Sequence, residues 1–423
     1  MAAKVISAVK GTRDFYPEKM ALRAWLYQQM RAASEAFGYQ EYDGPFLEPI
    51  ALYAAKSGEE LVKEQAFVFP DRSGDLITLR PELTPTLARM VAQKQGQLVF
   101  PLRWWSFGPF WRYERPQKGR AREFFQWNVD MVGVSSPEAD AELAAIGANF
   151  FWRVGLGPDE VQILVNNRRL MDSRLDALGV PPERRRAVFR LIDRREKMSP
   201  AAWEGYAEAV GLSPAQRRGL EDLLADERLW EQSEELGRFF AAAEALGVRD
   251  YLRYSPAVIR GLDYYTGTVF EARDRAGAFR AILGGGRYDN LVADVGGKPL
   301  PGVGFAMGDM VIALVLEAYD RLPQLTPQPA SIVVTVFDEA HLLPAYRLAA
   351  ELRGEGLAVL TYPEPAKLGK QFKYADRIGA RWALIVGPDE LAQNVVSVKD
   401  LATRKQHPVP RAHLAAFLHE RLS

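Results

Sequence analysis

The chain contains no cysteine, and histidine is almost absent from it. Without cysteine there can be no disulfide bond, no thiolate nucleophile and no zinc site with sulfur ligands. All histidines lie in the last quarter of the 423 residues, so the first 340 residues cannot build a histidine base or a histidine metal cluster. We therefore expect no zinc and no metal held by the protein alone. The histidines are His341, His407, His413 and His419.

Long hydrophobic runs are also missing. Two of the longest, residues 310–316 and 332–337, are far shorter than the roughly 18 to 20 residues that a membrane-spanning helix needs. The first residues, MAAKVISAVKGTRDF, meet charged side chains before an apolar stretch can form, unlike a secretory signal. We expect a cytoplasmic protein with no membrane partner.

An excess of charge of one sign is missing too, because 54 lysines and arginines balance 54 aspartates and glutamates. No global basic field therefore indicates a nucleic-acid partner, although a neutral total can hide local basic patches. What the chain does contain is 48% hydrophobic residues, enough to form sizeable cores. At roughly 150 residues per domain, its length predicts about three units.

Helical and strand patterns alternate in the first third of the chain. Apolar residues at three- and four-residue spacing over 18–38 predict an amphipathic helix. A turn sequence inside 67–80 predicts a hairpin, and Thr84 followed by Pro85 predicts a helix that Thr84 caps. Residues 101–133 have the alternation of two long strands around a charged loop.

The rest of the chain predicts a helical segment, further strands and a C-terminal domain. The pattern is helical from about 166 to 250 and strand-like over 258–272 and 278–289, and a glycine-rich run then leads into an apolar helix that ends near Tyr319. Three prolines in 321–329 predict a stiff linker. Beyond it, short apolar runs alternate with helical patterns, which indicates a small α/β domain with a mostly parallel sheet.

Polar residues of the two long strands share one parity. Because successive strand residues point to opposite faces, pairing these strands brings five polar side chains onto one polar floor above an apolar underside. A solvent-exposed sheet face is the simplest alternative. Against it, the connecting loop is rich in arginine and follows several aromatic residues, and arginine forks suit phosphate groups. The polar floor consists of Arg112, Glu114, Gln126, Asn128 and Asp130.

Three other segments carry polar groups. Glu82 and Thr84 are able to hold an ammonium group, although a plain helix cap is the simpler interpretation. The run RGLDYYTGTVFE (260–271) puts Arg260 and Asp263 into a strand-like pattern, which favours a site. In the C-terminal domain one helix presents a basic face that suits RNA or is simply solvated. This basic face consists of Lys370, Lys373, Tyr374 and Arg377.

These segments resemble those of a known family. FWRYERPQKGRAREFFQWNVD (110–130) resembles motif 2 of class II aminoacyl-tRNA synthetases, in the form found in the histidyl-tRNA synthetase family, and IRGLDYYTGTVFE (259–271) resembles that family's histidine-specific segment. The resemblance covers nearly the whole chain and is weakest at about 170–250. Further segments that resemble the family are KGTRDFYP (10–17), TLRPELTP (78–85), LGGGRYDNL (283–291) and LGKQFKYADRIGA (368–380).

The resemblance implies a multi-domain α/β protein. A class II catalytic domain with an antiparallel sheet would span 1–320 with a helical insertion at about 170–250, followed by a linker at 321–330 and an anticodon-binding α/β domain at 331–423. Histidine and ATP, with Mg²⁺, would give histidyl-adenylate and pyrophosphate, and the histidyl group would then pass to the 3′ end of histidine tRNA. A homodimer is implied as well, with residues 18–50 as a plausible interface.

Roles for single residues are also implied by the resemblance. Arg112 would contact the α-phosphate of ATP, Arg260 would lie across that phosphate, and these two would be the catalytic residues. Glu82, Thr84 and Gln126 would hold the amino and carboxylate groups of histidine. The imidazole would be bound by Asp130 and Tyr264, with Tyr265 nearby. The residues implied for ATP are Arg112, Glu114, Arg120 and Arg122, and those for tRNA are Arg115, Gln117, Lys370, Lys373 and Arg377.

Two positions depart from the family pattern. Val311 stands where the motif 3 helix usually carries an arginine against ATP, and Phe125 stands where many relatives have histidine. Val311 puts the binding of adenine and of the outer phosphates in question. Arg122 is a candidate to compensate for the missing arginine.

The departure at Val311 leaves a second hypothesis open, a catalytically silent synthetase-like paralogue that serves as regulatory subunit of ATP phosphoribosyltransferase. Such paralogues generally lack the anticodon-binding domain, whereas this chain has the corresponding segment and keeps Arg112 and Arg260. A third hypothesis, a prolyl or threonyl synthetase of the same subclass, conflicts with RGLDYY and with the lack of cysteine and histidine for a zinc site.

Overall fold

The computed structural model describes residues 5–54, 65–195, 198–260, 264–325 and 327–422. The chain divides into two compact units, Met1–Gln324 and Leu325–Ser423, rather than the three that its length suggested. In the described part of the chain, no helix has the length and apolar character required to cross a membrane.

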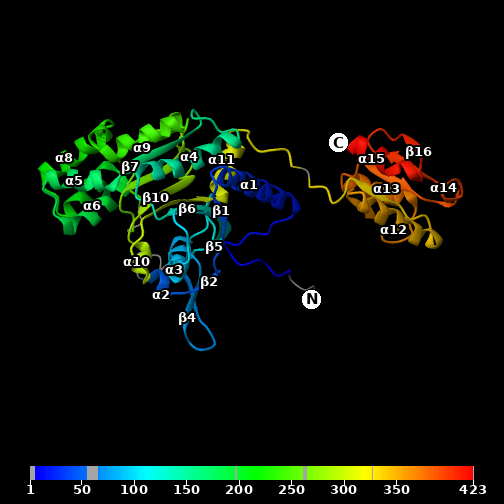
Figure 1. Ribbon diagram of the computed structural model, residues 1–423, viewed down its shortest axis with the longest axis horizontal. Coiled ribbons are helices and arrows are strands. Elements are labelled where there is room, and N and C mark those ends of the chain that lie inside the picture. Colours follow the sequence, from blue (N-terminus) through cyan, green and yellow to red (C-terminus); the bar gives the residue numbers. More distant parts are fainter. Residues whose placement is uncertain (1–4, 55–64, 196–197, 261–263, 326, 423) are drawn as a thin grey trace. The chain divides into compact units, whose positions relative to one another are not determined.

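An eight-stranded sheet lies at the centre of the first unit (Figure 1). The strand order is β1-β5-β6-β11-β10-β9-β7-β8, and neighbours are antiparallel except in the pairs β1-β5 and β7-β8. The predicted antiparallel core is therefore confirmed. The strands are β1 (Gln40–Glu41), β5 (Leu102–Trp111), β6 (Glu123–Val132), β7 (Val161–Asn167), β8 (Leu252–Tyr254), β9 (Thr268–Asp274), β10 (Leu283–Tyr288) and β11 (Gly302–Gly308).

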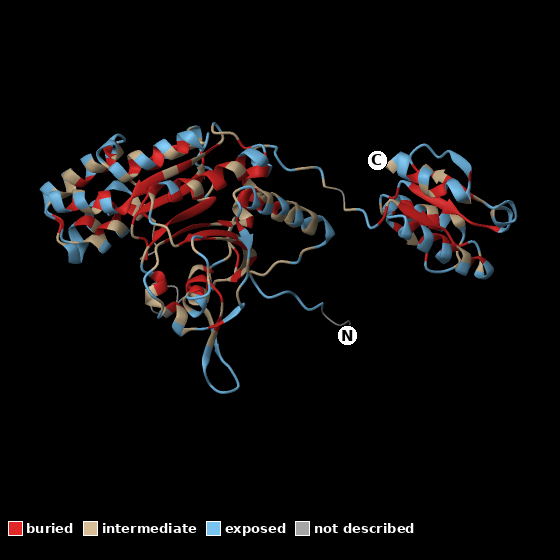
Figure 2. Ribbon diagram, viewed as in Figure 1, coloured by how far each residue is buried: buried red, intermediate tan, exposed pale blue. Residues whose placement is uncertain are grey.

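One face of this sheet forms the largest hydrophobic core. Trp127, Val129 and Met131 of β6 are buried there among apolar residues of several helices. Figure 1 shows two of them, α4 and α9, on the same side of the sheet, and Figure 2 shows that the strands themselves are mostly buried. Among the helices that contribute are α1 (Pro17–Glu35), α4 (Pro137–Arg153), α9 (Glu234–Ala245) and α11 (Asp309–Ala318).

The opposite face packs against α3 (Thr84–Lys94) and α10 (Leu291–Asp294), whose apolar residues form a second core with three tyrosines. Beside it lies a three-stranded sheet in the order β2-β4-β3. Its hairpin, β3 (Phe67–Pro70) and β4 (Leu76–Leu79), confirms the hairpin predicted over 67–80. The remaining elements here are β2 (Leu47–Pro49) and α2 (Ala51–Ala54).

The predicted helical segment is present between β7 and β8. Proline follows the N-cap of three of its helices, and two of these caps are serines: the hydroxyls of Ser199 and Ser213 accept the N–H groups of Ala202 and Gln216, both at 3.3 Å. The helices of the segment are α5 (Arg168–Ala177), α6 (Pro182–Arg194), α7 (Pro200–Ala209), α8 (Pro214–Ala225), η3 (Leu229–Gln232), α9 and η4 (Arg249–Tyr251).

The predicted strand over 258–272 begins only at Thr268, the first residue of β9. A backbone conformation and the contacts of one side chain explain the late start. Arg260 has a φ of 59°, which interrupts an extended strand. In addition, the guanidinium of Arg168 donates hydrogen bonds to the carbonyl oxygens of Ile259 and Tyr265, so these oxygens are bound to a side chain. Likewise, the strand predicted over 278–289 is shorter and corresponds to β10.

The second unit contains a five-stranded sheet in the order β13-β12-β14-β15-β16. The pairs β12-β13 and β12-β14 are parallel, while β14-β15 and β15-β16 are antiparallel, so the prediction of a mostly parallel sheet is wrong. The unpredicted strand β16 (Gln406–Pro410) contains two prolines, which hide a strand in the sequence and are tolerated at a sheet edge. The other strands are β12 (Ile332–Val334), β13 (Val359–Thr361), β14 (Trp382–Ile385) and β15 (Val395–Asp400).

Helices cover both faces of this smaller sheet. Apolar residues of α12 and α15 pack in one core, and Ala375 of α13 packs in the other. The helices are α12 (Glu339–Gly354), α13 (Leu368–Arg377), α14 (Pro388–Gln393), which was not predicted, η5 (Arg411–His413) and α15 (Leu414–Leu422).

Candidate functional site

The polar floor lies on the face of the eight-stranded sheet that packs against the second core, which contains Tyr264, Tyr265 and Tyr288. In the β5-β6 register, Gly108 pairs with Gln126, Ser106 with Asn128 and Trp104 with Asp130, and Arg112 follows the end of β5. The predicted sharing of one face is thus confirmed for Gln126, Asn128 and Asp130, whereas Arg112 and Glu114 lie beyond the end of β5. The alternative of a solvent-exposed face is wrong, because Asn128 and Asp130 are each only 3% exposed.

Asp130 is the most perturbed acid of the polar floor. Burial raises its pKa to about 7, although the hydroxyl of Tyr288 donates a hydrogen bond to its Oδ1 at 2.6 Å and acts in the opposite direction. On β11, the paired residue is Gly304, and a Cβ atom there would overlap Oδ1 of Asp130. The Asp130 carboxyl group therefore has a pKa near neutral pH. It also has the space that it occupies only because residue 304 is glycine.

Tyr264 links this carboxyl group to Glu82. Its hydroxyl donates to Oε2 of Glu82 at 3.3 Å, and its ring centroid lies 6.2 Å from that of Tyr288, the partner of Asp130. Burial raises the pKa of the Tyr264 phenol well above its usual value, the charge of Glu82 adds to the effect, and a hydrogen bond with Thr84 opposes it. Tyr265 lies 5.0 Å away, ring to ring. The structure thus brings together residues from four separate segments.

Thr84 does not cap α3. The N-cap of that helix is Leu83, with no side-chain capping hydrogen bond, and Thr84 is the first helical residue. The prediction of a cap was based on the Thr-Pro pair, but Pro85 occupies the second helical position instead of the first. The hydroxyl of Thr84 is consequently free of a capping role and reaches Tyr264.

Two buried polar atoms beside Asp130 lack a hydrogen-bond partner among the described residues. They are Nδ2 of Asn128 and the hydroxyl of Tyr42, whose ring lies 5.2 Å from that of Trp104. An unpaired buried polar group costs on the order of 1–3 kcal/mol, so such groups in native proteins call for an explanation such as a bound polar molecule. The floor has the donors and acceptors to bind a small polar molecule.

Arg112 stands at the edge of the floor, next to the Glu82 segment. Its Nε donates to the carbonyl of Pro81 at 3.0 Å, and its guanidinium lies 5.4 Å from the ring centroid of Phe124. These contacts use one donor of the guanidinium fork directly. The fork has further donors with the geometry that binds a phosphate or carboxylate group.

The loop between β5 and β6 forms a compact basic tip. Arg120 pairs with Glu114 at 2.5 Å, and its backbone exchanges two hydrogen bonds with that of Gln117. Arg122 lies over the ring of Tyr113, 4.0 Å from the centroid, and donates to the carbonyl of Glu114 at 3.4 Å. Arg115 and Gln117 are exposed. The implied ATP residues of this loop thus lie together, and the implied tRNA residues of the loop face solvent.

Arg260 does not join the polar floor through a direct hydrogen bond in the described contacts. Its Nη1 donates to Glu271 of β9, whose other oxygen accepts Nε of Arg273 at 2.6 Å. Its guanidinium lies over Gly284 of β10, where a Cβ atom would collide with it. Asp263, which the sequence pattern singled out with Arg260, lies outside the described residues.

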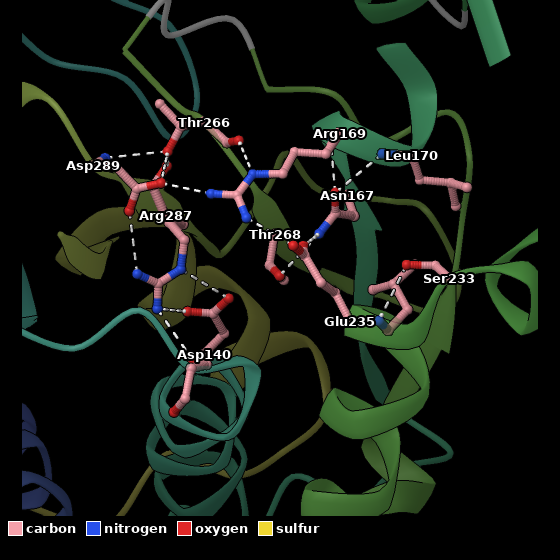
Figure 3. Close-up of polar contacts among 12 residues, drawn as sticks. Asp140, Asn167, Arg169, Leu170, Ser233, Glu235, Thr266, Thr268, Arg287 and Asp289 are labelled. Carbon is pink, nitrogen blue, oxygen red and sulfur yellow. Dashed lines mark hydrogen bonds and ion pairs between the residues drawn. The ribbon is translucent and has the colours of Figure 1, made fainter. Parts of the chain in front are cut away.

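A polar network connects the helical segment to this region (Figure 3). Arg287 of β10 pairs with Asp140 of α4 at 2.5 Å, and both are 2% exposed. Asp289 contacts Arg287 at 3.3 Å and Arg169 at 2.7 Å, and Arg169 also pairs with Glu235 at 2.7 Å. The sequence did not predict this network, because directly bonded members such as Arg287 and Asp140 are 147 residues apart.

Several other residues were missed as well. Tyr288 lies in the segment LGGGRYDNL, but nothing in that segment indicates that it contacts Asp130. Glu271 is the last residue of RGLDYYTGTVFE, and its contact with Arg260 was not predicted. At the start of α11, the carboxylate of Asp309 accepts a hydrogen bond from Nη2 of Arg13 at 2.8 Å and another from the backbone N–H of Phe125 at 3.0 Å. Val311, two residues later, packs against the large hydrophobic core. A cation from the N-terminal segment therefore lies at the start of the helix that lacks the expected arginine.

In the second unit, the basic face on α13 is confirmed as a surface feature. Lys370, Lys373, Tyr374 and Arg377 are exposed, whereas Gln371 and Ala375 are buried. Lys370 pairs with Glu364 at 3.3 Å. Three cations and an aromatic ring are therefore presented together on one surface of the second unit.

Known proteins resemble this chain over nearly its whole length. A family model described as histidyl-tRNA synthetase matches residues 11–310, and one described as anticodon binding domain matches residues 331–421. A histidine–tRNA ligase of Opitutus terrae is 40% identical and covers 98% of both chains; one of Leptospira biflexa is 34% identical and covers 98% of this chain and 97% of its own. The crystal structure of histidyl-tRNA synthetase from Nostoc sp. is 27% identical, with a TM-score of 0.82 over 99% of this chain and 100% of that one.

Proposed function

The chain belongs to the histidyl-tRNA synthetase family, and from this premise we propose how its residues carry out the reaction of a histidine–tRNA ligase. The enzyme uses ATP to activate histidine and transfers it to tRNA. The alternative of a silent regulatory subunit is not favoured, since relatives at 34–40% identity over nearly the full chain are histidine–tRNA ligases. A prolyl or threonyl synthetase is not favoured for the same reason.

Histidine binds on the polar floor in our proposal. Asp130 and Tyr264 hydrogen-bond the imidazole, with Tyr265 beside them, and Glu82, Thr84 and Gln126 hold the amino and carboxylate groups. The contacts that support this are the bonds of Tyr264 to Glu82 and of Tyr288 to Asp130. Such buried polar groups would be left unpaired by a substrate without an imidazole, which is a strong source of discrimination.

ATP lies beside histidine, with its α-phosphate at Arg112. Arg120 takes the outer phosphates, Glu114 and Arg122 complete the ATP site, and Arg260 faces the α-phosphate from the side of β10. Glu271 holds Arg260 before substrate arrives. With Val311 in the motif 3 helix, Arg122 supplies the charge that the missing arginine would otherwise provide.

Mg²⁺ enters as the complex with ATP. This ion takes most of its ligands from phosphate oxygens and water, with one or two protein carboxylates. Among the described residues, no group of three or more His, Cys, Asp and Glu could hold a metal by itself. The ion would neutralise phosphate charge.

The chemistry needs alignment and charge neutralisation, and no side-chain nucleophile. An oxygen of the histidine carboxylate attacks the α-phosphorus, the bond to the β-phosphate oxygen breaks, and pyrophosphate leaves. Arg112 and Arg260 stabilise the charge that develops on the α-phosphate. A hydroxyl of the terminal adenosine then attacks the activated carbonyl carbon, and AMP leaves.

For transfer of the histidyl group, we propose that residues of both units contact the tRNA. Arg115 and Gln117, exposed in the β5-β6 loop, contact the acceptor end, and Lys370, Lys373 and Arg377 bind the anticodon region. In this proposal residues 1–320 form the catalytic domain with its helical insertion at about 170–250, residues 321–330 form the linker, and residues 331–423 form the anticodon-binding domain.

We further propose a cytoplasmic homodimer in which residues 18–50 contribute to the interface. Large apolar side chains in this range are exposed, among them Phe46 at 45% and Leu47 at 48%, and burial of such residues in a second copy would be favourable. Sedimentation equilibrium checks the state: a mass of one chain, 47.4 kDa, at micromolar concentration would contradict it.

ATP–pyrophosphate exchange with each of the twenty amino acids, without tRNA, tests the enzyme and its specificity. The observation that carries the specificity is the buried Asp130 joined to Tyr288 on one side of the floor and Glu82 joined to Tyr264 on the other. We expect exchange with histidine alone, despite Val311. Histidine binding without exchange would contradict the proposed ATP site, and exchange with another amino acid would contradict the proposed floor.

A further inference from the structure

The start of helix α5 is attached to the segment that carries Tyr264 and Tyr265. Arg168 and Arg169, its first two residues, are called the arginine anchor below. The backbone N–H of Arg168 donates to the carbonyl of Gly267 at 2.9 Å. The anchor therefore begins where β7 ends, at the entry to the helical segment.

The guanidinium of Arg168 binds three carbonyl oxygens. Its Nε donates to Ile259 at 3.2 Å, its Nη1 to Tyr265 at 3.0 Å and its Nη2 to Arg260 at 2.6 Å. The residue is only 9% exposed, so these charge-assisted bonds are little weakened by water. A single side chain thus fixes backbone on both sides of Tyr264.

The position of Arg168 is itself held by aromatic rings. Its guanidinium lies 5.8 Å from the ring centroid of Tyr265 and 5.5 Å from that of Phe189 in α6. Phe189 belongs to the helical segment, and Tyr265 belongs to residues 259–271, which are called the histidine-binding segment after the role proposed above. The guanidinium therefore contacts both segments. A planar guanidinium meets three carbonyls and two rings, which a lysine ammonium cannot do with the same geometry.

Arg169 extends the attachment by one residue (Figure 3). Its Nε donates to the carbonyl of Thr266 at 3.2 Å, its Nη1 to Glu235 at 2.7 Å and its Nη2 to Asp289 at 2.7 Å. The hydroxyl of Thr266 also donates to Asp289 at 2.8 Å. Glu235 belongs to α9, so the last α-helix of the helical segment is joined to the same contact.

One conformation bound by the anchor is unfavourable on its own. Arg260 has a φ of 59°, in the left-handed region that non-glycine residues rarely adopt, and its carbonyl makes the shortest contact to Arg168. Such a conformation persists only where surrounding contacts hold it. The bond from Arg168 is one of these contacts.

We propose that Arg168 and Arg169 are positioning residues for histidine activation, through which the helical segment sets the placement of Tyr264, Tyr265 and Arg260. Neither anchor side chain is assigned a contact with histidine or ATP. The proposal rests on the roles proposed above for the residues that it positions. It gives the helical segment a part in adenylate formation, the step that needs no tRNA.

The test compares three variants by ATP–pyrophosphate exchange and by heat unfolding. Arg168→Lys keeps the charge and loses the three-carbonyl geometry, and Arg169→Ala removes the outer contact. Arg238→Ala is the control, because Arg238 makes a two-bond ion pair with Glu138 at 2.8 and 2.9 Å without touching the histidine-binding segment. We expect the KM for histidine to rise about tenfold in Arg168→Lys and several-fold in Arg169→Ala, with a smaller change in the KM for ATP and less than about twofold change in the control.

Hydrogen exchange provides a second readout. Amides 264–268 should exchange faster in Arg168→Lys at temperatures where all three variants are fully folded. Unchanged histidine KM and unchanged exchange in folded Arg168→Lys would overturn the proposal. If Arg168→Lys does not fold, Arg169→Ala decides, and a histidine KM equal to that of the wild type would overturn it.

Tyr264→Phe separates this inference from the proposed function. If Tyr264→Phe raises the histidine KM while the anchor variants do not, the histidine site is supported and the anchor is overturned. If Tyr264→Phe leaves the histidine KM unchanged in an enzyme that exchanges with histidine, the role of Tyr264 is wrong.

Discussion

Opposing effects act on the proton of Asp130. Burial disfavours its charge, and the phenol of Tyr288 stabilises that charge, but burial dominates and the pKa rises from 3.8 to about 7. The space that this carboxyl group needs exists because residue 304 is glycine. A single residue of the floor thus depends on partners from β10 and β11, each of which comes more than 150 residues later in the chain.

The raised pKa of Asp130 predicts a pH-dependent stability difference. Between about pH 4 and 7 the native state holds a proton that the unfolded state has released, so this group lowers the stability of the wild type as pH rises through that window. Asp130→Asn does not titrate. Its stability relative to the wild type should therefore increase by at most about 1.4 kcal/mol per pH unit within the window and level off above it. Urea unfolding of both proteins from pH 5 to 8 checks this, and parallel curves would contradict it.

Gly284 offers a way to displace Arg260 without removing it. A Cβ atom at position 284 would meet the guanidinium, which is the flexible end of a side chain, so Gly284→Ala should move the arginine more than it disturbs the sheet. We expect adenylate formation to fall at least about tenfold with only a small change in melting temperature. Gly237→Ala is the control, because nothing lies within 4 Å of a Cβ atom there. Equal activity of the two variants would refute the proposed role of Arg260.

At the scale of elements, helix α13 has one buried side that packs against the rest of the second unit and one exposed side that carries cations. Ala375 packs in a core of the second unit, and the buried amide of Gln371 exchanges hydrogen bonds with the backbone of Val336 at 2.9 and 2.7 Å. These contacts fix the rotation of the helix and leave Lys370, Lys373 and Arg377 exposed. The basic face is therefore rigidly presented, although its charges contribute little to folding.

Replacing Lys370, Lys373 and Arg377 by alanine should reduce tRNA charging and leave adenylate formation unchanged. Each lost phosphate contact weakens binding and makes it less dependent on salt, so we expect at least about a tenfold rise in the KM for tRNA. Charging and exchange assays on the same preparation separate the two steps. Arg347→Ala with Lys405→Ala, at other exposed positions of the second unit, is the matched control. A parallel loss of both steps would mean that α13 is needed for folding or that the RNA assignment is wrong.

The whole molecule consists of two units, each with cores of its own. The core that includes Leu143 lies within Met1–Gln324, and the core that includes Leu348 lies within Leu325–Ser423. Cooperativity in unfolding follows shared packing. The two units are therefore able to unfold as separate transitions.

Calorimetry tests this directly. Leu348→Ala and Leu143→Ala each remove a side chain that is at most 1% exposed, which costs about 2 to 5 kcal/mol in a packed core. We expect each variant to lower one of two melting transitions and to leave the other in place. One transition that shifts as a whole in both variants would contradict the independence of the units.

Local patterns in the sequence determined the long strands, the hairpin, the helical segment and the basic face of α13. Alternation and helical spacing are properties of neighbouring residues, so they can be recognised without knowing the fold. They also placed Gln126, Asn128 and Asp130 on one face. The family resemblance then supplied the roles that spacing alone cannot give.

Only the tertiary structure decided which residues meet across the chain. It paired Asp130 with Tyr288 and anchored the backbone around Tyr264 and Tyr265 on Arg168. It also showed that Thr84 does not cap its helix and that β9 begins only at Thr268. The physical reason is common to these cases: a buried donor or acceptor takes whichever partner the packing brings near, and that partner can lie 97 or 158 residues away, where local periodicity carries no information.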